Sequence, residues 1–430
     1  MIKIFDIKET DISSIIKRNT ELDRSVESIV EDIIKNVREN GDKALLEYCE
    51  KFDKAKLTSL EVSADEIDEA YNSADPEFIK TLEAAKANIY DFHRRQKREN
   101  FIVNEKDGVI LGQRIIPVEK AGLYVPGGTA SYPSSVLMNS IPAKIAGVSQ
   151  LVITTPPGPD GKIAPAILTA AKVAGVNRIF KVGGAQAIAA LAYGTETIPK
   201  VDNIVGPGNI FVATAKRMVF GAVNIDMVAG PSEILVIADA ESNPAYVAAD
   251  LLSQAEHDRL SSAILITTSR ELAVMVQNEL ENQIPLLPRT EIARTSIDNN
   301  GKIIIVDSLA QAVEVSNAIA PEHLEISTSD PFSLLNSVKN AGSVFLGRNG
   351  PEALGDYFAG PNHTLPTNGA ARFSSPLSVD DFIKKSSFIY YTKQALGKVQ
   401  EQIVDFAHRE GLDAHAKSIA IRFKEQGENE

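Results

Sequence analysis

The chain contains six histidines and a single cysteine, Cys49. Because one cysteine cannot form an intrachain disulfide or a thiolate cluster, any metal site must use His, Asp, Glu or Gln side chains. Imidazole changes its charge near neutral pH and is also a common metal ligand. Five of the six histidines follow residue 256, so we expect proton transfer or metal binding in the second half of the chain.

Gln254 and His257 lie three residues apart at the end of a predicted helix. Asn243 suits its N-cap, and Pro244 suits its first helical position. Residues three apart are neighbours on a helix surface, so a side-chain carbonyl and an imidazole could bind one cation there. The spacing alone also fits a pair that is merely solvated or hydrogen-bonded, and that alternative stays open at this point.

Glu322 and His323 follow Pro321 at the junction between a predicted helix and a predicted strand. A carboxylate and an imidazole at such a junction are a candidate acid/base pair, because connecting segments often carry catalytic groups. Neighbours in an extended chain point to opposite sides, so the two need not bond to each other. An ordinary surface Glu-His pair is the alternative.

The segment 351–367 is rich in glycine and proline, yet it holds several polar groups, among them Asp356 and His363. This density is hard to explain by turns alone. Glu410 and His415 lie five apart around a glycine near a helix start and are further candidates.

Two histidines have ordinary interpretations. His93 lies among basic residues and is expected to be solvated on a helix face. His408 precedes a glycine and is expected to favour the C-terminus of its helix through its charge.

The net charge of −13 over 430 residues argues against a nucleic-acid-binding protein, whose surface would be basic, and against binding to anionic membranes. No apolar run approaches the ~18 residues that a membrane-spanning helix needs. The start of the chain lacks an apolar signal core, so a cytoplasmic protein is expected.

Between residues 115 and 350 the pattern alternates between short β-branched runs and helices rich in alanine and leucine. The predicted strands lie at 150–155, 178–182, 202–205, 232–239, 262–269 and 302–308. This alternation indicates two parallel sheets covered by helices. Residues 1–110 and the region after 375 are predicted to be mostly helical.

Glycine turns follow or precede several of these strands, at 125–128, 183–186, 206–209 and 229–233. Such turns can present backbone N–H groups at a helix N-terminus, which favours a phosphate or another anion. The GxGxxG fingerprint of dinucleotide-binding domains is absent. The alternative is that the glycines only make tight turns, although four together favour an anionic cofactor.

These motifs, taken together, resemble the histidinol dehydrogenase family along nearly the whole chain. The matching stretches are GLYVPGGTA, GGAQAIAALA, VDNIVGPGN, AGPSE, DLLSQAEHD, APEHLE, GDYFAGPNHTLPT, ARFSS, LSVDDF and EGLDAHAKS. Each motif alone has low specificity, but their number and order are highly specific.

The resemblance implies an α/β fold with two incomplete Rossmann-like domains and small, mostly helical terminal segments. The expected parts are an N-terminal helical segment (1–22), an α/β domain with the metal and acid/base residues (23–122 and 234–374), an inserted NAD-binding α/β domain (123–233) and a C-terminal helical segment (375–430). The family is a homodimer in which the last segment reaches into the partner's site.

The resemblance also implies an activity, the NAD-dependent oxidation of L-histidinol to L-histidinaldehyde and then to L-histidine, the last stage of histidine biosynthesis. The implied zinc ligands, for one ion per subunit, are Gln254, His257, Asp356 and His415. The implied acid/base pair is Glu322 and His323. Substrate contacts would be Ser232, His363 and Glu410, together with His323 and the zinc ligands, and NAD contacts would be Tyr124, Gln186 and Asn209. Glu410 and His415 would serve the other subunit.

The chemistry of these side chains suggests how they would act. Two imidazoles, a carboxylate and an amide oxygen suit zinc, although Mn or Co could substitute. We expect the metal mainly to position the substrate, with activation of the alcohol as the alternative. His323 is the expected base. Cys49 carries no site motif, so the aldehyde should be oxidised as its hydrate, with water activated by Glu322.

Three other functions fit parts of the pattern. A zinc hydrolase would also use His and Asp ligands with a Glu base, a relative could act on another amino alcohol, and a binding protein could hold a structural metal. A Gln ligand argues against the last of these, because structural zinc sites are usually closed by Cys and His.

Overall fold

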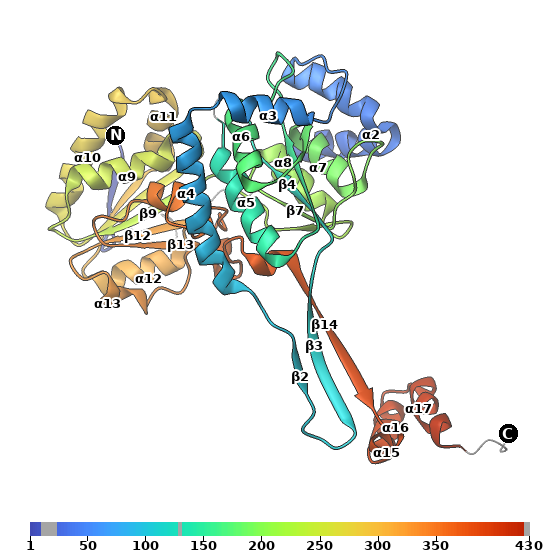
Figure 1. Ribbon diagram of the computed structural model, residues 1–430. Helices are drawn as coiled ribbons and strands as arrows, with labels where there is room; N and C mark the ends of the chain where they lie inside the picture. Colours follow the sequence, from blue (N-terminus) through green and yellow to red (C-terminus); the bar gives the residue numbers. More distant parts are fainter. Residues whose placement is uncertain (10–23, 128–130, 425–430) are drawn as a thin grey trace. The chain divides into compact units, whose positions relative to one another are not determined.

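The computed structural model describes residues 1–9, 24–127 and 131–424 (Figure 1). Within them the chain forms two compact units. The first unit takes its residues from 1–97 and 118–382, and the second from 98–117 and 383–430. In these described parts no helix combines the length and the apolar character that a bilayer crossing requires.

One sheet of the first unit has six parallel strands in the order β1-β11-β10-β9-β12-β13. The strands are β1 (Lys3–Asp6), β9 (Glu233–Ala238), β10 (Ser262–Thr267), β11 (Lys302–Ile305), β12 (His323–Ser327) and β13 (Ser343–Leu346). From β9 the chain builds outward through β10 and β11, and then it crosses to the other side of β9 for β12 and β13. The order of the strands therefore reverses between β9 and β12.

Helices cover both faces of this sheet, which explains why its central strands are apolar along their length. One face packs on α9 (Pro244–Ala255), α10 (Arg270–Gln283) and α11 (Thr290–Asn300). The other face packs on α12 (Leu309–Ile319), with α13 (Phe332–Leu335) beyond it. A short helix, α14 (Glu352–Tyr357), follows β13.

The second parallel sheet has five strands in the order β6-β5-β4-β7-β8. They are β4 (Lys120–Tyr124), β5 (Gln150–Thr155), β6 (Arg178–Lys181), β7 (Asn203–Val205) and β8 (Asn224–Ile225). One face carries α5 (Pro133–Ala146) and α6 (Pro165–Ala174), and the other carries α7 (Gly184–Tyr193) and α8 (Ile210–Val219). Here the order reverses between β4 and β7.

The N-terminal helices pack on the five-stranded sheet. They are α2 (Arg24–Tyr48), which bends at Gly41 and continues as a π-helical turn (Cys49–Asp53), α3 (Ala64–Ser73) and α4 (Pro76–His93). α2 contacts α7 and α8, α3 contacts α6, and α4 contacts α5. The apolar faces of these helices are buried in the cores of the five-stranded sheet. The division that joins residues 23–122 with 234–374 stays a prediction.

The first residues differ from the expected helix. Lys3–Asp6 is a strand that pairs with β11 in parallel register, because the apolar Ile2 and Ile4 complete the edge of the six-stranded core. The remainder of the predicted N-terminal helical segment, 10–22, lies outside the described residues.

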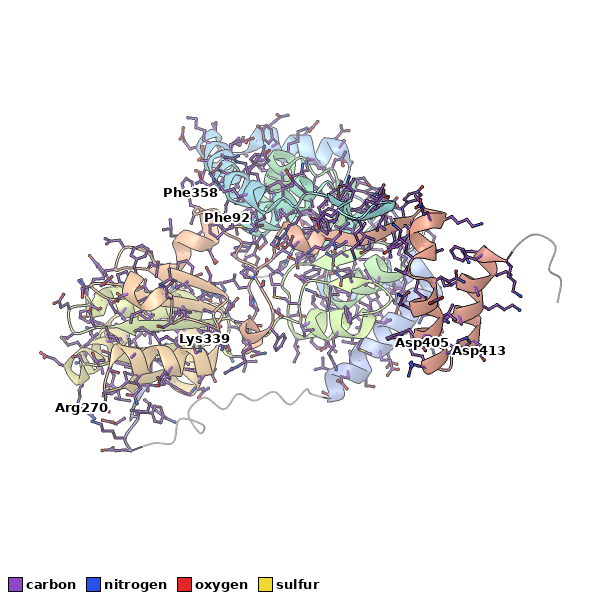
Figure 2. All side chains as sticks on the ribbon, turned by 90° about the horizontal axis from the view of Figure 1, so that it is seen from below. Phe92, Arg270, Lys339, Phe358, Asp405 and Asp413 are labelled. Atoms are coloured by element: carbon purple, nitrogen blue, oxygen red, sulfur yellow. The ribbon has the colours of Figure 1, made fainter. Side chains whose placement is uncertain are left out.

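The second unit combines a small antiparallel sheet with helices. The sheet is ordered β14-β3-β2, from β2 (Phe101–Val103), β3 (Val109–Pro117) and β14 (Ile383–Tyr391). α15 (Lys393–Gly397), α16 (Gln400–Arg409) and α17 (Asp413–Ala420) follow, and Asp405 and Asp413 mark the last two in Figure 2. Helix was expected from 375 onward, but β14 pairs with β3 along all nine of its residues.

Short 3-10 turns complete the elements. They lie at Arg94–Gln96, Ile284–Leu286, Ala370–Arg372, Val379–Phe382 and Ile421–Phe423.

Candidate active site

Glu322 and His323 lie at the amino end of β12, beside the amino end of β9. The backbone of Glu233, the first residue of β9, binds both side chains. Its N–H donates to Glu322 Oε2 at 2.8 Å, and its carbonyl lies 3.0 Å from His323 Nδ1. The pairing of two parallel strands therefore fixes the candidate acid/base pair.

His323 is held as a neutral base. A carbonyl oxygen can only accept, so Nδ1 donates its hydrogen to Glu233, and this leaves the lone pair on Nε2. Nε2 is buried without a hydrogen-bond partner among the described residues, 3.8 Å from Glu352 Oε1. Burial lowers the pKa of His323, while the nearby charge of Glu352 opposes this shift. The ring is thus neutral and oriented to take a proton.

Glu322 is buried, and its environment favours the protonated form. Burial raises the pKa of Glu322 well above its usual value, the backbone N–H of Glu233 opposes this, and neighbouring carboxylates add to it. A carboxyl whose pKa moves toward neutrality is better suited to general acid/base work than an ordinary glutamate. The geometry therefore agrees with a proton-transfer role.

A third acidic residue, Glu352, joins this site and was not predicted from the sequence. It lies four residues before Asp356 on α14, so both carboxylates project from the same face of the helix. Ligand atoms of His323, Glu352 and Asp356 all lie within 4.8 Å of one another. The Glu-x-x-x-Asp spacing in PEALGD is the sequence signal that could have found Glu352.

The two carboxyls of α14 have opposite tendencies. Burial, and then the charge of Glu352, raises the pKa of Asp356 well above its usual value. For Glu352 burial acts in the same direction, but the charge that His323 carries when it is protonated, and hydrogen bonds from Asp356 and Ser253, hold its pKa below the usual value. Two buried carboxyls that compete for one proton form a site in which a cation would relieve their repulsion.

Gln254 and His257 lie at the C-terminal end of α9, as expected. Gln254 is the penultimate residue of the helix, and His257 follows in a turn where its N–H donates to the Gln254 carbonyl at 3.1 Å. The charges of Glu352 and Glu256 act on His257, whose pKa is lowered mainly by burial. The charge of Glu352 thus reaches His257, although the close group of His, Asp and Glu ligand atoms among the described residues contains His323, Glu352 and Asp356 and not His257.

The donor set fits a divalent metal. Gln254 is about 1% exposed, and neither its Oε1 nor its Nε2 has a hydrogen-bond partner in the described parts of the chain. Glu352 Oε1 is orphaned in the same way. Buried polar atoms rarely lack partners in native proteins, so these oxygens are available as ligands for a cation. Three of the four expected zinc ligands, Gln254, His257 and Asp356, belong to this region of the first unit.

His363 is already hydrogen-bonded by both of its ring nitrogens. Its Nδ1 lies 3.1 Å from the Asp356 carbonyl, and its Nε2 lies 3.2 Å from Ser135 Oγ. Burial lowers the pKa of His363 to about 4, so the ring is neutral. Ser232 directly precedes β9, and its carbonyl accepts from Ser262 N at 3.0 Å. That His363 and Ser232 contact the substrate stays a prediction.

Glu410 and His415 belong to the second unit. Glu410 follows the last residue of α16, His415 lies in the first turn of α17, and both side chains are exposed. That Glu410 and His415 complete the site of a partner subunit stays a prediction. His408 lies in the last turn of α16, as expected, and contacts Asp413 at 2.9 Å.

His93 is not solvated as we expected. It is 0% exposed at the end of α4, and its Nδ1 lies 2.7 Å from Gln96 Oε1. The short turn after the helix folds back over the ring, which sequence spacing alone does not reveal.

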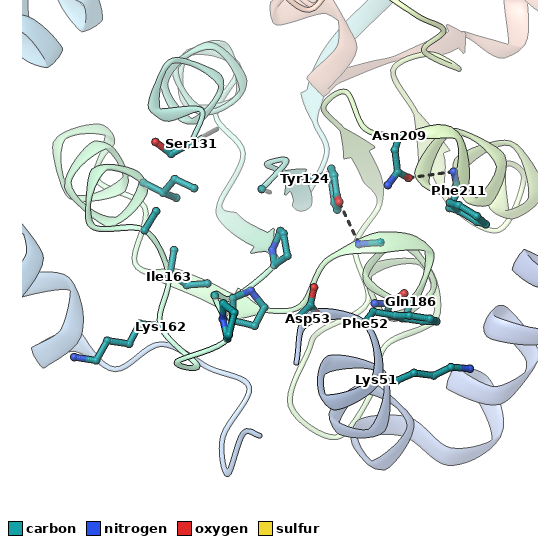
Figure 3. Close-up of a pocket in the computed structure, with 18 of the residues that line it drawn as sticks. Lys51, Phe52, Asp53, Tyr124, Ser131, Lys162, Ile163, Gln186, Asn209 and Phe211 are labelled. Carbon is teal, nitrogen blue, oxygen red and sulfur yellow. Dashed lines mark hydrogen bonds between the residues drawn. The ribbon is translucent and has the colours of Figure 1, made fainter. Parts of the chain in front are cut away.

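A cavity of about 1060 Å³ lies at the carboxyl ends of the five-stranded sheet (Figure 3). Tyr124, Gln186 and Asn209, the three expected NAD contacts, all line it. Residues of the π-helical turn, Lys51 to Asp53, line it as well, and no sequence motif had pointed to them. The volume lies at the upper end of the range that small-molecule and cofactor sites usually have.

The glycine turns let the backbone close around this cavity. The Gly184 N–H donates to the Tyr124 hydroxyl at 3.1 Å, and Asn209 Oδ1 accepts from Phe211 N at 3.1 Å (Figure 3). Pro156 packs so tightly on Gly127 and Gly183 that a Cβ at either would lie 2.5–2.6 Å from its ring. Gly128, in the first of the four predicted turns, lies outside the described residues.

Cys49 begins the π-helical turn beside the cavity but does not line the cavity. It is 0% exposed, and its Sγ lies 3.3 Å from the Lys181 carbonyl. Burial raises the pKa of the Cys49 thiol to about 12. A thiol in this state is not a nucleophile at neutral pH.

Known proteins resemble this chain in sequence and in fold. The profile of a family described as histidinol dehydrogenase matches residues 16–423. A histidinol dehydrogenase of Clostridium acetobutylicum is 57% identical over 408 residues, which cover 95% of this chain and 94% of the relative. One from Listeria monocytogenes is 57% identical over 410 residues, with 95% and 96% covered. The crystal structure of histidinol dehydrogenase from Elizabethkingia anophelis matches with a TM-score of 0.93 at 41% identity, over 99% of each chain. The chain belongs to the histidinol dehydrogenase family.

Proposed function

We propose that the chain oxidises L-histidinol to L-histidinaldehyde and then to L-histidine, with two molecules of NAD as hydride acceptors. The observation that carries this proposal is the group of His323, Glu322, Glu352 and Asp356. It places a neutral imidazole base among three carboxyls, two of which, Glu322 and Asp356, have a raised pKa. Family membership supports the substrate, and the cavity lined by Tyr124, Gln186 and Asn209 supports the dinucleotide.

In the first oxidation, His323 Nε2 takes the hydroxyl proton of histidinol while the carbinol carbon loses its hydride to NAD. The orientation of His323 is set by the Nδ1 hydrogen bond to the Glu233 carbonyl. Glu352 Oε1, 3.8 Å from Nε2, would stabilise the imidazolium that forms. General base catalysis of this kind contributes about 100- to 10,000-fold.

The second oxidation starts from an aldehyde, which has no hydroxyl proton to lose. An enzyme thiol often solves this problem as a thiohemiacetal, but the only cysteine of the chain is buried and bonded elsewhere. The aldehyde therefore reacts as its hydrate. Glu322, in its carboxylate form, takes a proton from the attacking water, while the imidazolium of His323 returns its proton from the first oxidation to the aldehyde oxygen. The neutral His323 then takes a hydroxyl proton of the hydrate as the second hydride leaves to NAD.

A divalent metal, most simply zinc, would be held by Gln254, His257 and Asp356, with His415 as the fourth protein ligand. When bound, it supplies a positive charge that can hold the amino and imidazole nitrogens of histidinol. The orphaned Gln254 amide and the competing carboxyls of α14 support this assignment. The role of the protein is to place the carbinol carbon against His323.

The proposal includes a homodimer in which His415 and Glu410 complete the partner's site. Both side chains are exposed on the second unit, which supports a role outside it. Mixing inactive Gln254→Ala and His415→Ala proteins under exchanging conditions should restore about a quarter of the wild-type activity, because half of the dimers then hold one intact site of two. No recovery would place His415 in its own subunit's site. The cytoplasmic location stays a prediction.

The direct test of the activity is NADH formation by the purified, zinc-loaded chain with L-histidinol. We expect two NADH per histidinol consumed, and loss of the reaction after treatment with a chelator, followed by recovery with zinc. A hydrolase cannot change the absorbance of NAD. No NADH, or full activity without metal, contradicts the proposal.

A further inference from the structure

A buried ion pair beside the cofactor cavity has no part in the chemistry proposed above. Lys216 lies on α8, Asp226 follows β8, and each side chain is about 1% exposed. The Lys216 ammonium contacts the Asp226 carboxylate directly. The attraction within a buried pair often does not exceed the cost of removing both charges from water, so stability alone is a weak reason for such a pair.

Both members of the pair bind the backbone of a single residue, Gly206. Lys216 Nζ donates to the Gly206 carbonyl at 2.8 Å, and the Gly206 N–H donates to Asp226 Oδ2 at 2.8 Å. Gly206 has a φ of +113°, and a Cβ there would lie 2.1 Å from the Tyr124 carbonyl oxygen. The N–H and the carbonyl of Gly206 are therefore both hydrogen-bonded to the ion pair, and the residue packs closely against the end of β4.

Gly206 begins the turn that leads into the cofactor cavity. The turn ends at Asn209, whose Oδ1 accepts from Phe211 N and Val212 N at 3.1 and 3.2 Å and so caps α8. This use of the oxygen leaves the amide nitrogen of Asn209 as the group that can donate to a ligand. The position of Asn209 thus depends on Gly206, three residues earlier.

Asp226 also connects this turn with the chain that continues toward the acid/base site. Its Oδ1 accepts from Met227 N at 2.6 Å, and residues 227–232 lead directly into β9. One carboxylate therefore fixes the start of that segment and the start of the cofactor turn.

The geometry points to Lys216 and Asp226 as positioning residues for the dinucleotide. The pair fixes Gly206, and through it holds Asn209 and the end of β4 at Tyr124 in the arrangement that receives NAD. This inference rests on the proposed use of NAD. It predicts that removing the pair weakens the binding of NAD while leaving the binding of histidinol nearly unchanged.

The test uses the full, zinc-loaded chain with Lys216→Met, which keeps the aliphatic stem and removes the ammonium, and Asp226→Asn, which keeps the shape. Arg178→Met is the matched control. It removes the Arg178–Glu61 ion pair from β6 of the same sheet, and neither residue lines the cavity. The measurements are the KM values for NAD and histidinol, the Kd of NAD by calorimetry without turnover, and the melting temperature.

A displaced Asn209 would lose its hydrogen bond to the dinucleotide, so we expect the KM and the Kd for NAD to rise about tenfold in both variants. The KM for histidinol and kcat should stay within about twofold, and Arg178→Met should leave both KM values unchanged. A folded Lys216→Met protein with an unchanged Kd for NAD overturns the inference, as does an equal rise in both KM values.

If neither single variant folds, the combined Lys216→Met, Asp226→Leu protein removes both charges and serves for the same comparison. Its predicted result is the same selective loss of NAD binding, and normal NAD binding overturns the inference. Failure of the wild-type chain to form NADH from histidinol would instead refute the proposed function, because the Kd for NAD is measured without the substrate.

Discussion

The two parallel sheets of the first unit place their candidate sites at opposite ends of their strands. In the five-stranded sheet the strand order reverses between β4 and β7, and the cavity lies at the carboxyl ends of those strands. That is the usual position in open α/β sheets. In the six-stranded sheet the order reverses between β9 and β12, yet Glu322 and His323 lie at the amino ends.

The carboxyl end of β9 and β12 is filled by the protein's own polar groups. Asp239 follows β9, and its carboxylate accepts from Ser329 N at 2.8 Å, from Arg348 at 2.9 Å and from Ser242 Oγ at 3.1 Å. Ser242 Oγ also bonds to the Ser327 carbonyl at the end of β12. These contacts close the place where the usual rule would put a ligand.

Helix polarity explains why each end suits its ligand. In a strand–helix unit the helix N-terminus follows the carboxyl end of a strand, and it presents N–H groups that favour an anionic dinucleotide. The helix C-terminus lies toward the amino ends and carries the negative end of the dipole, which favours a cation. α9 ends at Gln254 and His257, and α12 ends just before Glu322. The amino end of the six-stranded sheet is thus the end that would suit the proposed metal and the proposed imidazolium.

The largest effect should come from the amino end of the six-stranded sheet. His323→Asn removes the base of both oxidations, and we expect kcat to fall about 100- to 10,000-fold for histidinol and for histidinaldehyde alike. Steady-state rates with each substrate measure this. Asp239→Asn, at the other end of the same strands, is the control and should leave both rates within about twofold. A comparable loss in the control would break the comparison.

Glu322→Gln should separate the two half-reactions. Only the aldehyde needs an activated water, so we expect its oxidation to slow about 100-fold while alcohol oxidation changes less than about threefold. The ratio of the two rates, followed as NADH formation, is the measurement. Equal losses of rate in the two oxidations would contradict the separate roles that we assign to Glu322 and His323.

The filled carboxyl end should contribute stability. Burial would raise the pKa of Asp239, but hydrogen bonds from Ser329 and Arg348 hold it below its usual value. A lowered pKa in the folded state means that the contribution is present above the unfolded value of about 3.9 and is lost as the pH falls below it. Asp239→Asn should therefore lower Tm by about 2–4 °C, equally at pH 5 and pH 8. An unchanged Tm would show that these contacts stabilise nothing.

Asp53, which lines the cofactor cavity, should affect Tm less than Asp239 does, and its replacement should raise Tm instead of lowering it. Burial raises the pKa of Asp53 to about 6, and its Oδ2 has no hydrogen-bond partner in the described parts of the chain. A raised pKa means that ionisation favours unfolding, so the destabilisation develops from about pH 4 to pH 6 and stays above it. Without NAD, Asp53→Asn should raise Tm by about 1–2 °C at pH 8 and by less at pH 5. A lower Tm at pH 8 would mean that the carboxylate is partnered.

The strand–helix alternation was predictable because β-branched runs and alanine-rich helices signal a parallel sheet directly. The antiparallel β14 and the four-residue β1 were missed, since each depends on a partner strand far away in the sequence. Glu352 was missed because α14 has only six residues, so the Glu-x-x-x-Asp spacing occurs once and is not repeated along a longer helix. The choice of the amino end depends on which strands pair, and only the register of β9 with β12 reveals it.

We propose that the six-stranded sheet holds its metal and its acid/base pair at the amino ends of β9 and β12. The most direct test is an anomalous difference map, recorded at the zinc edge, from crystals of the zinc-loaded protein. We predict one strong peak per chain, bounded by Gln254, His257 and Asp356. A peak at the carboxyl end beside Asp239, or no peak near the α14 carboxylates, would contradict the account.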